Sequence, residues 1–126
     1  MTNAKSIFDT AIKLMDEQQE NSGSSFTQDT KDYELRTLSI LNVLRHELYI
    51  RSYTYTPGFR CPKIMTMEQE IDLDDTVAEG VAPYGLAAHL LLGENDSMAA
   101  FFNERYMELM YKLGNSQQAE WEEIVM

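Results

Sequence analysis

The chain has 126 residues, 44% hydrophobic and 25% charged, which predicts a single domain over residues 1–126 and excludes a largely disordered chain. Ten Lys and Arg against 21 Asp and Glu give a formal charge of −11, so we expect no non-specific binding to DNA or RNA. No apolar run approaches the ~18 residues that cross a bilayer, and no signal peptide is recognisable, so a soluble, non-membrane protein is expected. The lone Cys61 cannot form an internal disulfide and fits a reducing cytoplasm.

The first predicted helix covers about residues 3–19. Ile7, Ala11 and Met15 recur there at helical spacing and form one apolar stripe. The polar stretch after it, residues 20–28, is rich in Ser and Gly and predicts a flexible loop.

The second predicted helix begins after Asp29 or Thr30, either of which can cap its first turn, and runs toward Arg51. One apolar stripe consists of Leu38, Leu41, Leu44 and Leu48. Further apolar residues widen this surface, namely Tyr33, Ile40, Val43 and Ile50. Because a surface helix needs only one apolar face, we interpret this helix as the central one of the domain.

An extended segment is predicted between the second and third helices. Residues 53–62 are β-favouring but contain a Pro-Gly turn signal and a second proline. Across residues 63–73 apolar and polar residues alternate, with Gln69 as the exception, which is the period of a half-buried strand. This arm either pairs with residues 53–55 as a short hairpin or leaves an open edge that another subunit could fill.

The third predicted helix starts at residues 74–79, where an acidic pair and a Thr-x-x-Glu spacing suit a helix N-terminus. Gly80, Pro83 and Gly85 lower helix propensity in its middle, so we expect a kink or a close helix contact there. Gly93 is a natural residue to end this helix.

The fourth predicted helix is capped by Asn95 or Asp96 and ends at Gly114. The tail, residues 115–126, is either helical or disordered until it meets a partner. The predicted fold class is therefore mainly α: a small helical bundle of about four helices, with an extended β-like arm or short hairpin between helices 2 and 3.

The sequence offers little material for catalysis. Its two histidines stand apart from any Cys or Asp cluster at ligand spacing, and we interpret His46 as part of a solvated helix face and His89 as a core or interface residue. Cys61 lies in no nucleophile signature, and no Gly-rich phosphate loop or calcium loop is present. We expect no enzyme activity, no catalytic residue, no cofactor and no metal.

The chain is rich in Met, Tyr and Phe, residue types that are enriched where proteins touch one another. Several of these, with apolar residues of the arm and the tail, are hard to place in a core. We predict them as protein-interface residues, the alternative being that they cover the local core: Tyr53, Tyr55, Phe59, Met65, Met67, Ile71, Trp121 and Ile124.

The order of elements and four short segments resemble the head–tail connector (head completion or adaptor) proteins of tailed bacteriophages and prophages. Residues 33–44 resemble the family's long helix, 71–75 its arm-to-helix junction, 84–92 its small-residue helix and 99–106 its final helix. The resemblance covers about residues 5–113 and not the tail.

The resemblance implies a structural virion protein, a homo-oligomer that forms a ring below the portal and joins the DNA-filled head to the tail. Its partners would be the portal protein and tail or neck proteins, with DNA only passing through the channel. It would reside in the virion neck, and in the host cytoplasm during assembly. The alternative is a small acidic protein-binding module, a nucleic-acid mimic or inhibitor of a basic partner.

Overall fold

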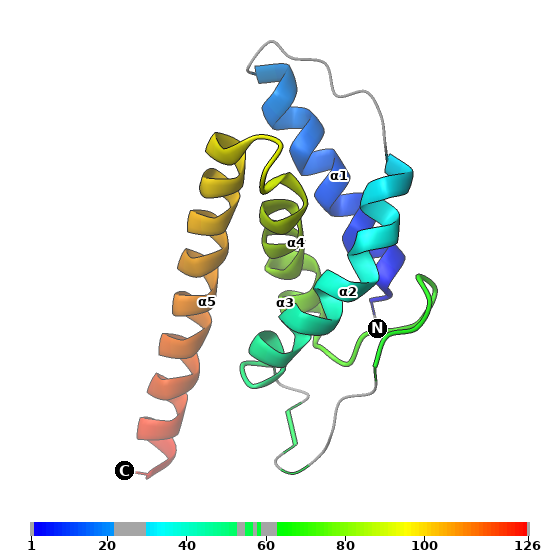
Figure 1. Ribbon diagram of the computed structural model, residues 1–126. Helices are drawn as coiled ribbons and strands as arrows, with labels where there is room; N and C mark the ends of the chain where they lie inside the picture. The colour runs from blue at the N-terminus through cyan, green and yellow to red at the C-terminus, as the bar shows by residue number, and fades with distance from the viewer. Residues whose placement is uncertain (1, 22–29, 53–54, 57, 59–62, 126) are drawn as a thin grey trace.

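The computed structural model describes the backbone of residues 2–21, 30–52, 55–56, 58 and 63–125, and the side chains of these except 18–21, 30–31 and 114–125. Within these residues the chain forms five helices (Figure 1). They are α1 (Ala4–Asn21), α2 (Thr30–Tyr49), α3 (Asp75–Gly80), α4 (Ala82–Leu91) and α5 (Asp96–Val125). The mainly α prediction is confirmed.

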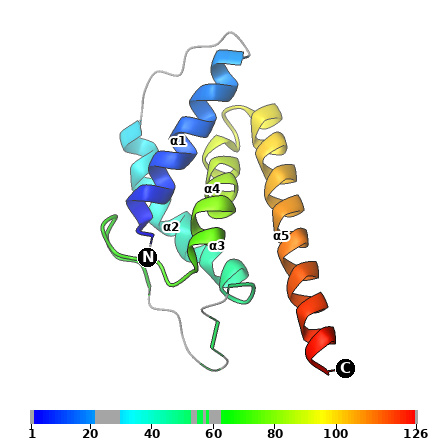
Figure 2. The same cartoon turned by 180° about the vertical axis from the view of Figure 1, so that it is seen from behind.

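The central helix is α4. It contacts each of the other four helices, and Figure 2 shows it between α5 on one side and α1 and α2 on the other. Eight of its ten residues are buried, because Ala and Gly let neighbours approach closely while Leu fills the space between them. The prediction that the second helix is central is wrong: α2 buries Leu41, Leu44 and Leu48 but leaves Val43 and Ile50 exposed.

The predicted third helix is two helices, α3 and α4, that break at Val81. Pro83 has no N–H to donate to the carbonyl of Glu79, so the α-helical ladder cannot continue through it. Val81 closes α3 by donating its N–H to the Val77 carbonyl, with φ −120° and ψ −48°. The expected kink is therefore found as a complete break.

The expected close helix contact is also present. Gly85 of α4 lies against the ring of Tyr106 of α5: a Cβ at Gly85 would stand 2.8 Å from Tyr106 Cε1 and 3.2 Å from Leu44 Cδ1. Only a residue without a side chain lets α4, α5 and α2 meet there. Gly93 follows α4 with φ +93°, a conformation that favours glycine, and ends the helix as predicted.

The described residues 63–73 form no strand. They are a loop whose one β-bridge joins Glu70 to Asn3. The Gln69 side chain folds this loop, because its Oε1 accepts from the Met65 N–H and its Nε2 donates to the Lys63 carbonyl. Gln69, the one exception to the alternation of apolar and polar residues, is thus the residue whose side chain bends the chain.

The same loop caps α1. The first-turn N–H groups of α1 have no partner within the helix, and those of Ala4 and Lys5 donate to the carbonyls of Gln69 and Met67. In return the Ile71 N–H donates to the Thr2 carbonyl. The segment therefore pairs with this chain's own N-terminal residues; of the predicted hairpin partner at 53–55, only residue 55 is described.

The fifth helix, α5, does not end at Gly114 but continues to Val125. A glycine inside a helix costs only about 1 kcal/mol relative to Ala, which does not by itself stop a helix. Asn95 caps it as predicted, since its Oδ1 accepts from the Met98 N–H at 3.1 Å. Beyond α3 the last turns of α5 project past the bundle in both ribbon views.

Candidate interaction surface

The loop 63–73 is held against α2 by Asn42. The Asn42 Nδ2 donates to the Ile64 carbonyl at 2.9 Å, and its Oδ1 accepts from the Ile64 N–H at 2.8 Å. The side-chain amide of Asn42 thus makes both hydrogen bonds that the backbone of a neighbouring strand would make with Ile64. Ile64, Ile71 and Leu73 are anchored in the core beneath it.

The predicted interface residues in and near this loop differ in how exposed their side chains are. Met65 and Tyr55 are 66% and 42% exposed, and the Tyr55 ring packs edge-on against Tyr49 with 5.3 Å between ring centroids. Met67 is half-buried against the core and Ile71 is only 1% exposed, so Ile71 packs within this chain. Met65 and Tyr55 remain available to a partner.

The other predicted interface residues cannot be placed. Tyr53 and Phe59 lie outside the described residues, as does Cys61. Trp121 and Ile124 are residues of α5, but the structure describes only their backbone and not their side chains. Their role in protein contacts stays a prediction.

The outer face of α5 carries an apolar surface that the sequence analysis did not single out. Phe101, Met107 and Tyr111 are large and exposed, and they line a shallow hollow of about 730 Å³ along the helix. The ion pair between Arg105 and Glu108, 3.1 Å long, crosses this face, and the Glu108 carboxylate raises the pKa of the Arg105 guanidinium. The surface is therefore amphipathic and locally neutral.

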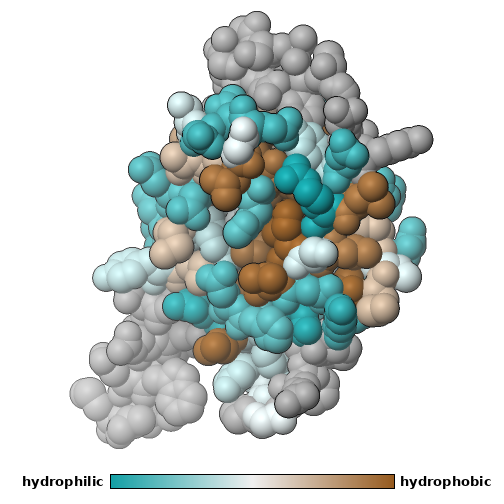
Figure 3. Space-filling model, in the orientation of Figure 1, coloured by the Kyte–Doolittle hydropathy of each residue, from teal (hydrophilic) through white to brown (hydrophobic). Residues whose placement is uncertain are grey.

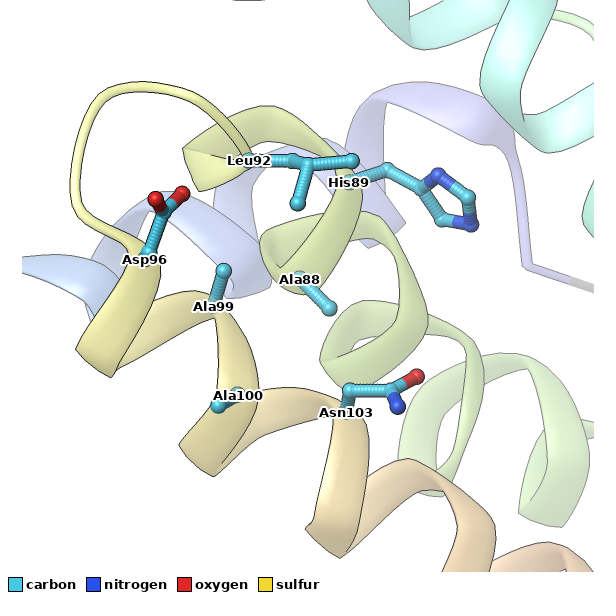
Figure 4. A pocket seen from close by; sticks show the side chains of 7 residues that line it. All are labelled: Ala88, His89, Leu92, Asp96, Ala99, Ala100 and Asn103. Carbon is cyan, nitrogen blue, oxygen red and sulfur yellow. The ribbon is translucent and has the colours of Figure 1, made fainter.

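A second hollow, of about 330 Å³, lies between α4 and α5 (Figure 4). The methyl groups of Ala88 and Ala99 lie between the facing helices, and the ring of His89 points away from them at the edge. His89 is exposed rather than buried in the core, and His46 is exposed on α2 as predicted. The arrangement offers an apolar groove and not a set of converging polar groups.

The buried polar atom of greatest interest is the hydroxyl of Tyr106, at the junction of α5, α4 and α2. The side chain is 4% exposed, and among the described residues its hydroxyl has no hydrogen-bond partner. Burial raises the pKa of this phenol above its ordinary value, and nearby Glu47 raises it further while Arg51 opposes the shift. Tyr106 lines none of the described cavities.

Charge is distributed unevenly over this surface. The loop 63–73, the N-cap residue Asp74 and α3 together expose or half-expose six acidic side chains and, after Lys63, no Lys or Arg. These acids are Glu68, Glu70, Asp72, Asp74, Asp75 and Glu79. The side of the molecule formed by the loop and α3 is therefore strongly negative, in contrast to the neutral outer face of α5.

The chain matches no protein-family model, no curated protein and no solved structure. Within the part that the structure describes, no three His, Cys, Asp or Glu side chains gather into a group that could hold a metal ion. None of the helices in that part combines the length and apolar character of a membrane span.

Helical geometry could have revealed the α5 surface from sequence. At about 100° per residue, Phe101, Met107 and Tyr111 fall on the opposite side of the helix from Phe102 and Tyr106, which are buried.

Proposed function

We propose that this chain is a structural subunit of a ring that joins the head of a tailed bacteriophage or prophage to its tail, a head–tail connector. The observation that carries this proposal is that apolar side chains are exposed on opposite flanks of one small bundle. Figure 1 places α5 on one flank and the loop 63–73 on the other. Met65 is exposed on the loop, and Phe101 and Tyr111 on α5.

A ring needs two different surfaces on every subunit, because each copy meets one neighbour on its left and another on its right. The two flanks meet this need, because each exposes apolar side chains. The loop also carries Glu68 and Glu70, whereas the charged residues of the α5 face balance one another: Glu104, Arg105, Glu108 and Lys112. In the ring, the loop 63–73 acts as the arm that packs against α5 of the neighbour.

The acidic surplus suits a conduit for DNA. A channel wall with net negative charge repels the phosphate backbone, so packaged DNA can pass without binding to the wall. The same charge is the basis of the alternative function, an acidic module that occupies a basic partner. That module would bind a basic protein with an affinity that falls steeply as salt rises.

The test is to mix the purified chain with the portal protein of the same phage or prophage, and to measure mass by light scattering and inspect the particles by negative-stain microscopy. A closed ring on the portal is the expected result. Met65→Asp and Tyr111→Asp each place a charge on one flank and should prevent ring closure. Leu92→Asp is the control, because Leu92 is as exposed but lies in neither flank.

Two results would contradict the proposal. One is the absence of any complex with the portal at every concentration tested. The other is a monomer that binds basic proteins with strong salt dependence, which would favour the acidic module.

A further inference from the structure

We draw no further inference here: the strongest candidate, the exposed apolar patch over α2 and the surface beside it (Figure 3), carries no proposal, because nothing in the structure shows what covers it.

Discussion

Replacing Gly85 by Ala tests the packing at the centre of the molecule. The new Cβ would lie 2.8 Å and 2.9 Å from two ring carbons of Tyr106 and 3.2 Å from Leu44 Cδ1. Both neighbours are buried, so the ring cannot move aside freely. Overpacking of this kind costs about 1–3 kcal/mol, whereas the higher helix propensity of Ala returns at most about 1 kcal/mol.

We therefore expect Gly85→Ala to lower the free energy of unfolding by about 1–2 kcal/mol. The matched control is Gly80→Ala: Gly80 is also helical, but a Cβ there would meet nothing within 4 Å. Only the propensity gain applies to it, so this variant should be as stable as the parent chain or more stable by up to about 1 kcal/mol.

The assay is urea unfolding followed by far-ultraviolet circular dichroism, with all variants at one protein concentration because any self-association would shift the midpoint. The slope of the transition should stay the same and the midpoint should fall. If Gly85→Ala unfolds at the same urea concentration as Gly80→Ala, the contact between α4 and α5 does not constrain this position and the reasoning is refuted.

Three other substitutions probe the contacts described above. Asn42→Ala strips the Ile64 backbone of both its partners and should cost about 2–4 kcal/mol in urea unfolding, whereas Asn103→Ala on exposed α5 should cost little. Tyr106→Phe removes a buried hydroxyl that has no partner among the described residues, so it should be neutral or stabilising. A loss above about 1 kcal/mol would reveal a hydrogen-bond partner outside them. Because the raised phenol pKa makes the folded Tyr106 ionise later than the unfolded one, the parent chain loses stability above about pH 10, and Tyr106→Phe should lose less on thermal melting at that pH. Asp74→Ala removes the cap of α3 and should lower stability by about 1 kcal/mol, with Asp72→Ala as a comparison that leaves the cap intact.

Local rules predicted the helices and their interruptions well. Pro83 and Gly85 indicated both the break and the close approach, since a missing N–H and a missing side chain act within the chain itself. Gly93 ended α4 for a similar local reason, its positive φ. Gly114 did not end α5, because a glycine that keeps helical dihedral angles is only a weak breaker.

Features that depend on distant residues could not be read in the same way. The alternation in residues 63–73 predicted a strand, but its polar and apolar pattern serves a loop folded by Gln69 and bonded to the N-terminal residues. The two apolar faces of α2 predicted a central helix, because sequence does not say whether a face is covered by the same chain. Ile71 was assigned to an interface although it packs in the core, for the same reason.

The contact between residues 2–5 and 67–71 has a consequence for the order of folding. The α4 and α5 helices are joined by a short turn, so they can pair early at a small entropic cost. Docking α1 onto the loop closes a segment of more than 60 residues, and this step is expected to come late. Substitutions at Gly85, in the early contact, should then mainly slow folding. Substitutions at Gln69, in the late contact, should mainly speed unfolding. The two contacts would thus differ in their effect on the rates, although equilibrium unfolding shows a single cooperative transition for both.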